Sequence, residues 1–255
     1  MKNIKAKFKM NSVTYLLILT ALLTGFIKNI SLILIIVIFH ECGHIIVLKH
    51  YEYEIEKVEI YPFGGVTKVK KPINTPLKKE VMIASAGVLF QILLYFIFWY
   101  LTSLGILREN TFQLFQIYNK SILLFNLLPI IPLDGSIIIH SCLEYFFPYQ
   151  KAYRYYFIIS LMIFFLFFIS QTLKSLNNYM ILTFLVFKIY EAYKKKKYYE
   201  NKFFLERFLY EYPYIKMESH PYPDLSKLKK DTLHFFWIKD RYLHEKEFLK
   251  KHFTK

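Results

Sequence analysis

The sequence predicts an all-α polytopic membrane protein: six transmembrane helices with a broken fourth segment, a short membrane-associated β-hairpin and a small C-terminal cytoplasmic extension. Three observations favour this class. More than half of the 255 residues, 55%, are hydrophobic. The apolar residues form blocks of about 17 to 25, the length that crosses a bilayer. Lys and Arg, which give a net charge of +15, are sparse within these blocks and dense between some of them.

The same composition limits the partners. A lipid bilayer is expected around the apolar blocks. Nucleic acid is not expected, because no basic stripe with interleaved aromatic residues lies on a polar domain. The two cysteines, Cys42 and Cys142, both lie in apolar segments, so they imply no disulfide framework.

The apolar runs can be followed in order. A basic stretch, residues 1–10, precedes the first, as in a signal peptide, but no small-residue cleavage site follows, so an uncleaved span is preferred. Lys28–Asn29 and Tyr149–Arg154 are interpreted as turns, and Lys194–Lys197 as the end of the membrane region. The expected spans are Val13–Ile27, Ile30–Leu48, Val81–Ile106, Leu114–Leu128, Tyr155–Thr172 and Tyr179–Tyr193.

A polar segment, residues 49–80, separates the second and third runs. Two short alternating stretches, Lys57–Ile60 and Val66–Val69, flank the pair Gly64–Gly65, which predicts a β-hairpin. Two interpretations remain open. The hairpin is either an ordinary cytoplasmic loop or an edge with which an extended substrate pairs.

The fourth apolar run is interrupted at Pro129, Pro132 and Gly135, before a short helix expected over Ser136–Phe147. Non-helical backbone at membrane depth is tolerated only where protein or a wet cavity surrounds it. A broken segment that also carries Asp134 therefore indicates a functional site.

The charge distribution predicts the topology. Residues 1–10, 49–80, 149–154 and the tail from Lys194 carry 4, 7, 2 and 16 basic residues. The alternate loops carry only Lys28, Arg108 and Lys174. By the positive-inside rule, both termini are cytoplasmic. The second and fourth spans then run inward, and His44 and Asp134 come to the same side of the membrane.

The second run contains His40-Glu41-Cys42-Gly43-His44, which reads H-E-x-x-H. On a helix, the two histidines share a face and can bind one zinc ion, while Glu41 can accept a proton from water. Such residues are costly in an apolar span and are expected to serve function. Gly43 leaves room for close approach. Cys42 points away from the metal face and is interpreted as a packing residue.

A catalytic zinc normally has three protein ligands and a water. Asp134 is the best candidate for the third ligand, because it is the only Asp of the membrane region and the broken helix can turn it inward. His140 and Glu144, four residues apart on a predicted helix, compete with it. Their preferred interpretation is a polar stripe near the membrane interface.

Two motifs, Phe39–His44 and Asn126–Gly135, resemble those of the site-2 protease family of intramembrane zinc metalloproteases. The second motif follows that family's form, N-x-x-P-x-x-P-x-D-G. The likeness covers about residues 10–195. The likeness is greatest to the sporulation branch of the family. It rests there on the Asn-Leu-Leu-Pro run, the six spans and the Pro-Phe-Gly-Gly hairpin.

The resemblance implies a role for each matching residue. His40, His44 and Asp134 are expected to bind Zn2+. Glu41 is expected to be the catalytic base, and Asn126 to assist near the scissile bond.

The resemblance also implies partners and a location. The sporulation branch cleaves the pro-sequence of a sigma factor, pro-sigma K, and is inhibited by two membrane partners, stage IV sporulation protein FA and the bypass-of-forespore protein. The expected location is the membrane that surrounds the forespore, facing the mother cell.

Two domains are expected, residues 1–195 and the basic tail 196–255. The sporulation branch resembles proteins with a C-terminal CBS domain, but no glycine-containing CBS pattern is clear here, which puts nucleotide binding in doubt. His234–Asp240 followed by Arg241–Phe253 fits one strand–turn–helix remnant. A short docking module and a basic extension near anionic lipid both remain open for the tail.

The predicted reaction is peptide hydrolysis, with Glu41 moving the water proton and Asn126 donating to the developing oxyanion. An unwound substrate is expected to contact the hairpin and the broken segment, through Phe63, Gly64, Gly65 and Pro132.

Two other functions compete with a protease. Lys120 and Lys188, both in apolar spans, favour an ion-handling transporter, but no inverted repeat is visible. An inactive binding scaffold is disfavoured because all four central site residues are present.

Overall fold

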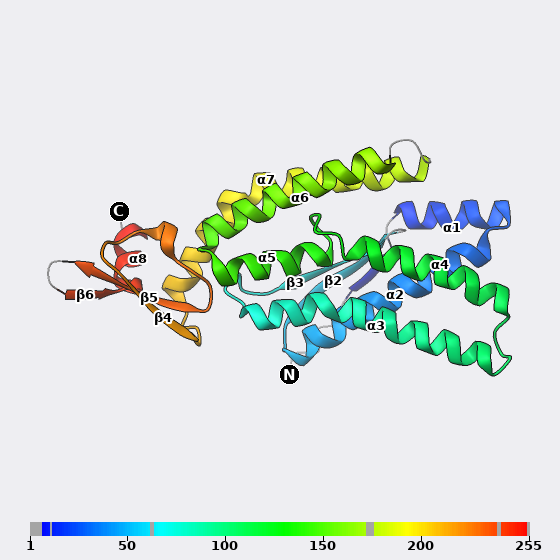
Figure 1. The fold of residues 1–255 in the computed structure, drawn as a ribbon, viewed down its shortest axis with the longest axis horizontal. Helices are drawn as coiled ribbons and strands as arrows, with labels where there is room; N and C mark the ends of the chain where they lie inside the picture. The colour runs from blue at the N-terminus through cyan, green and yellow to red at the C-terminus, as the bar shows by residue number, and fades with distance from the viewer. Residues whose placement is uncertain (1–6, 11, 62–63, 172–175, 239–240, 254–255) are drawn as a thin grey trace. The chain divides into compact units, whose positions relative to one another are not determined.

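The computed structural model describes residues 7–10, 12–61, 64–171, 176–238 and 241–253. Within them the chain is mostly helical, with two small sheets (Figure 1). The elements are β1 (Lys7–Met10), α1 (Ser12–Thr24), α2 (Ile27–His50), β2 (Glu54–Tyr61), β3 (Gly64–Lys70), α3 (Leu77–Ser103), α4 (Glu109–Asn126), α5 (Asp134–Phe146), α6 (Tyr149–Gln171), α7 (Leu176–Leu209), β4 (Lys216–His220), the 3-10 helix η1 (Leu225–Lys227), β5 (Thr232–Ile238), β6 (Arg241–His244) and α8 (Glu245–Phe253).

The chain divides into two units, which are described separately. The first holds residues 1–71 and 82–128, and the second holds residues 72–81 and 129–255. The predicted division at residue 195 stays a prediction.

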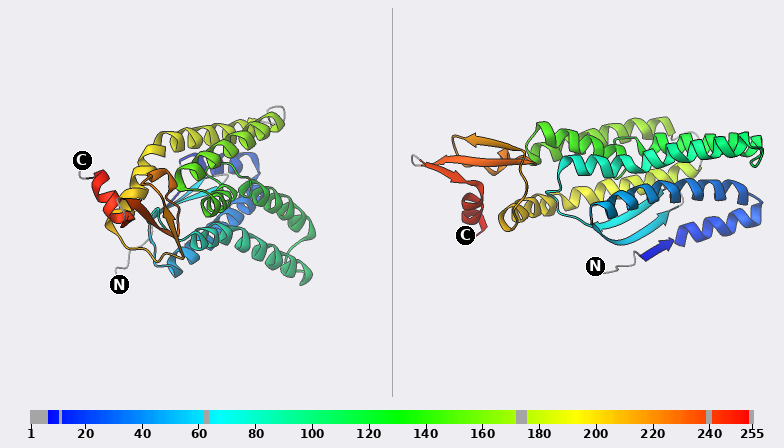
Figure 2. Two further views of the ribbon diagram at one scale, coloured as in Figure 1. Left: turned by 60° about the vertical axis from the view of Figure 1, so that its left-hand side comes forward. Right: turned by 90° about the horizontal axis from the view of Figure 1, so that it is seen from below.

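In the first unit, α2 is covered on one side by helices and on another by the hairpin. Leu32 and Ile36 of α2 pack with Leu94 of α3 and with Phe112 and Phe115 of α4. Toward its C-terminal end, the same helix packs on β2, as the pictures also show (Figure 2). This second cluster consists of Ile45, Leu48, Ile55 and Val58. The helix is therefore held from two directions.

The predicted hairpin is confirmed. Strands β2 and β3 are antiparallel, with Val58 opposite Thr67 and Ile60 opposite Gly65. The sequence did not predict β1, which pairs in parallel with β2 and completes a sheet of order β1-β2-β3. Phe63 of the predicted substrate-binding set lies outside the described residues.

In the second unit, α6 and α7 run side by side, and α7 leads to a sheet of order β4-β5-β6 (Figure 1). Alternate residues of β5 are buried, among them His234 and Phe236. Phe236 packs with Phe203 of α7 and Leu249 of α8. The strand and the helix expected at the end of the chain are thus observed. Arg241–His244 form strand β6 instead of the start of the helix, and residues 239–240 of the expected turn lie outside the described residues.

Two expected turns are wrong. Lys28–Asn29 lies inside α2, and the real break precedes it at Gly25, whose φ of +79° suits a residue without a side chain. Residues 149–154 lie inside α6, which begins directly after Pro148. Polar residues near a helix end continue the helix when neither Gly nor Pro interrupts the backbone.

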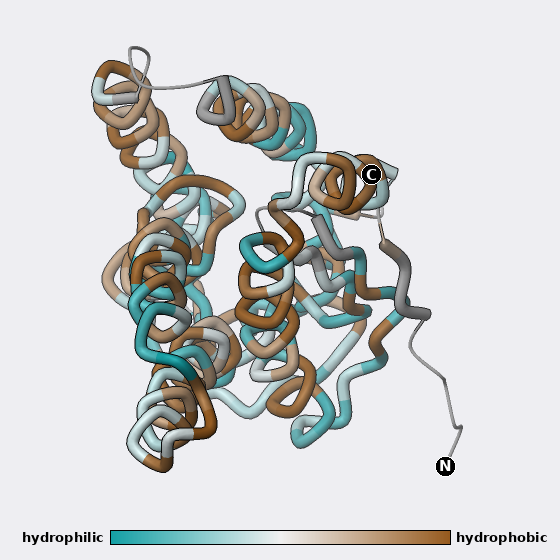
Figure 3. Tube along the Cα trace, turned by 90° about the vertical axis from the view of Figure 1, so that its right-hand side faces the viewer, coloured by the Kyte–Doolittle hydropathy of each residue, from teal (hydrophilic) through white to brown (hydrophobic). Residues whose placement is uncertain are grey.

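Three described helices are long and apolar enough to cross a membrane: α2, α3 and the Tyr149–Ser170 part of α6. Hydrophobic residues occur on several sides of the helices (Figure 3). On α3, for example, Leu89, Phe96 and Trp99 are all more than half exposed. Such surfaces suit lipid rather than water. These helices support a membrane protein, and the count of six spans stays a prediction.

Candidate metal and catalytic site

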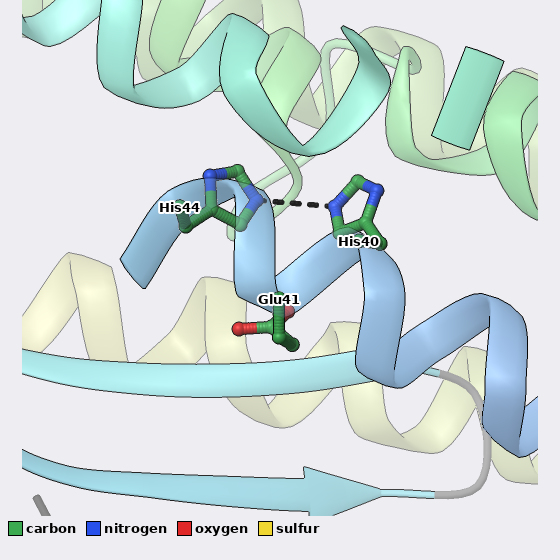
Figure 4. Close-up of side chains that lie close together, drawn as sticks. All are labelled: His40, Glu41 and His44. Carbon is green, nitrogen blue, oxygen red and sulfur yellow. Dashed lines mark hydrogen bonds between the residues drawn. The ribbon is translucent and has the colours of Figure 1, made fainter. Parts of the chain in front are cut away.

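The H-E-x-x-H residues lie in the buried middle of α2. We call His40, Glu41 and His44 the motif cluster. All three are buried, and their ligand atoms lie within 4.8 Å of one another. The two imidazole rings lie next to each other on one side of the helix, and Glu41 points toward the hairpin (Figure 4). The helical spacing therefore brings the two rings together as predicted.

Hydrogen bonds identify which ring nitrogens carry protons. His44 Nδ1 lies 2.8 Å from the carbonyl oxygen of Ile83, which only accepts, so this nitrogen is the donor. His40 Nδ1 lies 3.2 Å from Gln91 Oε1. Gln91 Nε2 donates to the backbone carbonyl of Asn119 at 2.8 Å, so Oε1 is the atom that faces His40. In the neutral rings, each Nε2 keeps a lone pair.

The geometry fits a metal ion. The Nε2 atoms of His40 and His44 lie 3.1 Å apart and are joined by a hydrogen bond (Figure 4), so a bound metal ion would take the place of the shared proton. Two Zn–N bonds of about 2.0–2.1 Å at a tetrahedral angle would place the nitrogens about 3.3 Å apart. Gly87 of α3 provides the space, because a Cβ there would lie 2.5 Å from both Nε2 atoms. A metal is thus compatible with the donor atoms and with the room around them.

The hairpin holds the carboxylate of Glu41. Thr67 Oγ1 of β3 donates to Glu41 Oε2 at 2.8 Å. A Cβ at Gly65 would overlap the same carboxylate, so only glycine allows this strand to lie so close. The structure therefore brings Gly65 to the candidate base, while a Cβ at Gly64 would meet nothing within 4 Å. A role of either glycine in substrate binding stays a prediction.

The remaining predicted residues lie at the ends of helices or just before them. Asn126 is buried at the end of α4 in the first unit. Asp134, half-buried, is the first residue of α5 in the second unit, and Pro132 is exposed just before it. Their roles stay predictions.

The rival pair for the third ligand is engaged elsewhere in the second unit. Glu144 Oε2 accepts from Lys230 Nζ at 3.0 Å, and His140 Nδ1 lies 3.7 Å from the same carboxylate oxygen. Because Lys230 belongs to the tail, Glu144 takes part in an ion pair that anchors the tail to α5.

A second group of metal-ligand type lies in the tail. We call Glu218, His220 and His234 the tail cluster; its candidate ligand atoms are also within 4.8 Å of one another. Here His234 Nε2 accepts from the backbone N–H of Lys229 at 2.9 Å. His234 Nδ1 must then carry the ring proton and donate to His220 Nε2, 3.0 Å away. His234 then has no lone pair left for a metal ion, which argues against a metal site here.

The sequence did not single out Gln91 or Thr67. Gln91 did leave a signal, because it is a buried amide within an apolar span and lies four residues after Gly87. Thr67 left none, because its contact depends on how β3 lies on α2. The close approach expected at Gly43 is confirmed. A Cβ at Gly43 would lie 2.5 Å from the carbonyl oxygen of Ala86.

Comparison with known proteins agrees with this site. Residues 28–108, which include the motif cluster, match the model of peptidase family M50. The chain thus contains a domain of this family, that of the site-2 proteases.

Two known proteins are similar in sequence to this chain. Stage IV sporulation protein FB of Bacillus subtilis is 36% identical over 193 residues, 73% of this chain and 66% of that protein. A zinc metalloprotease of Methanocaldococcus jannaschii is 29% identical over 153 residues, 55% of this chain and 44% of that protein. The chain thus spans about two thirds of the first relative and less than half of the second.

A solved structure has the same fold. The site-2 protease from Methanocaldococcus jannaschii matches with a TM-score of 0.55 at 23% identity, over 77% of this chain and 93% of that one. The family and the relatives support the predicted enzyme class, a zinc metalloprotease, and do not favour a transporter.

Proposed function

We propose that this chain is an intramembrane zinc metalloprotease that hydrolyses a peptide bond of a membrane-associated protein near the cytoplasmic face. One observation carries the proposal. The Nε2 atoms of two imidazoles lie 3.1 Å apart, next to a buried glutamate, in a helix apolar and long enough to cross a membrane.

His40 and His44 would hold Zn2+ through Nε2, and Asp134 is proposed as the third ligand. When bound, Zn2+ polarises the scissile carbonyl and lowers the pKa of the attacking water. The start of α5 at Asp134, directly after a non-helical stretch, supports this role, because the break leaves the carboxylate at a helix end.

Glu41 is proposed to accept the proton of the attacking water and to deliver it to the leaving amine. The Thr67 hydroxyl holds Oε2 of this carboxylate, so Oε1 is the oxygen proposed to take the proton. Asn126 is proposed to donate to the developing oxyanion.

An unwound substrate is proposed to pair with the hairpin. β3 is an edge strand of the described sheet, and Gly65 within it lies against the candidate base. Main-chain pairing along such an edge holds a peptide extended, and extended backbone exposes the carbonyl to be cleaved. Phe63, Gly64 and Pro132 complete the proposed contacts.

The biological context is also a proposal. The name of the Bacillus relative places that protein in stage IV of sporulation. With the sequence resemblance, this supports a substrate of the pro-sigma K type and inhibitory partners like stage IV sporulation protein FA and the bypass-of-forespore protein. Six spans, cytoplasmic termini and a forespore-surrounding membrane belong to the same proposal.

The test is co-expression with candidate pro-sigma factors, with cleavage followed by immunoblot. Glu41→Gln should reduce cleavage by about 10²–10⁴-fold, because the proton acceptor is lost, while zinc content is retained. Asp134→Asn should reduce both cleavage and zinc content. The matched control is Glu109→Gln, at the exposed start of α4, which should cleave normally. Full activity of Glu41→Gln would rule out the mechanism.

A further inference from the structure

We propose that Gln91 is a positioning residue of the metal site: its side-chain amide fixes the tautomer and the orientation of His40. This inference rests on the proposed function, because it concerns the same zinc site.

One face of α3 contacts the motif cluster once per turn. Ile83, Gly87 and Gln91 are spaced four residues apart and therefore share a face of the helix. Ile83 accepts from His44 through its backbone carbonyl, Gly87 leaves the space beside both rings, and Gln91 accepts from His40. Of the two acceptors, only Gln91 uses its side chain, so only its contact can be removed by substitution.

The burial of Gln91 requires an explanation. Its side chain is 0% exposed in a helix apolar enough to cross a membrane. A buried amide is costly unless both of its ends are hydrogen-bonded. Both ends are, because Oε1 accepts from His40 and Nε2 donates to Asn119 of α4. These two hydrogen bonds offset the free-energy cost of burying the amide. They also connect α4 through α3 to α2.

The direction of the amide is determined by its partners. The carbonyl of Asn119 cannot donate, so reversing the amide would place two acceptors face to face. Gln91 therefore always presents oxygen to His40 Nδ1, which keeps its proton there. His40 Nε2 then carries a lone pair in the direction of His44 Nε2, as a metal ligand requires.

The test measures zinc affinity directly, by competition with a chelator on the purified full-length protein in detergent. Gln91→Met removes the acceptor at similar length. Gln91→Glu keeps an acceptor for Nδ1–H, and its carboxyl proton can serve Asn119. The control is Gln116→Met, because the side chain of Gln116 on α4 instead donates to Tyr95 Oη, at 3.3 Å. Thermal unfolding of each variant is recorded alongside.

We expect Gln91→Met to weaken zinc binding by about 10–100-fold, as for other partners of metal-binding histidines. Gln91→Glu should stay within about threefold of the wild type, and Gln116→Met should be unchanged. Wild-type affinity in Gln91→Met overturns the proposal, as does a Gln91→Glu protein that binds zinc as weakly as Gln91→Met.

If Gln91→Met does not fold, a loss of zinc affinity in folded Gln91→Glu still overturns the proposal. Absence of zinc binding by the wild-type protein would instead contradict the proposed function, so the two failures are distinguishable.

Discussion

The motif cluster and the tail cluster contain the same residue types, two histidines and a glutamate, at the same range of distances. Their hydrogen bonds give them opposite properties. In the motif cluster, both Nδ1 atoms donate to oxygens outside it, so both Nε2 atoms are left for a shared metal ion. In the tail cluster, Lys229 donates its backbone N–H to His234 and its Nζ to Glu218. Residue type and distance therefore do not distinguish a metal site from a structural pair, whereas the position of the ring proton does.

The contrast extends to other buried polar groups of the second unit. Arg207 donates to both carboxylate oxygens of Glu245, at 3.1 and 2.7 Å. Lys230 Nζ lies 3.0 Å from Oε2 of Glu80 and 3.0 Å from Oε2 of Glu144. Each of these groups is paired with another, so we expect them to serve stability rather than chemistry.

The largest expected effect on stability is at Lys230. Burial lowers the pKa of Lys230, but Glu144 and Glu80 raise it further, and the net direction is upward. Lys230→Met would leave two buried carboxylates without their cation, so the free energy of unfolding should fall by about 3–5 kcal/mol. Urea unfolding measures this loss of stability. It is followed by the fluorescence of Trp237, with Trp99, the other tryptophan of the chain, replaced by Phe.

The neighbouring Lys229 provides the control. Its ion pair with Glu218 is partly exposed, so Lys229→Met should cost only about 0–1 kcal/mol. If the two lysine variants lose equal stability, the second unit does not depend on its buried pairs as described.

The next effect concerns zinc and tests the motif cluster. Gly87→Ala would place a methyl group against both Nε2 atoms. Overpacking costs about 1–3 kcal/mol and would displace both nitrogens, so zinc affinity should fall by about 10–100-fold. Gly64→Ala is the control, because a Cβ there meets nothing within 4 Å. Unchanged zinc affinity in Gly87→Ala would show that the metal does not lie between the rings.

The smallest effect is a pH dependence of the tail. Burial, with a contribution from the positive charge of Arg207, lowers the pKa of His234 to about 3. The unfolded value is about 6.5, so between these values the unfolded chain binds a proton that the folded chain does not. Stability is fully present above about pH 6.5 and is lost as the pH falls toward 3.

Burial also lowers the pKa of His220, so this residue too makes the free energy of unfolding fall as the pH falls. Urea unfolding at several pH values between 7 and 4 measures the slope. His234→Gln should flatten it, and an unchanged slope in that variant would assign the dependence to other groups.

The sequence predicted the half of the site that follows from helical spacing. His40 and His44 share a face in any α-helix, and their apolar surroundings indicated burial. Gln91 and Thr67 were missed because they come from other segments, and their contacts depend on how α3 and β3 pack on α2. The turns at Lys28 and Tyr149 were misplaced because polarity was taken as a helix-ending signal, whereas Gly25 and Pro148 end the helices.

The most direct test is the zinc stoichiometry of the purified protein, measured by mass spectrometry. The wild type should bind one zinc ion per chain. His40→Ala/His44→Ala should bind none, and His220→Gln/His234→Gln should still bind one. Zinc retained without the motif histidines, or lost with the tail histidines, would contradict the assignment of the metal to the motif cluster.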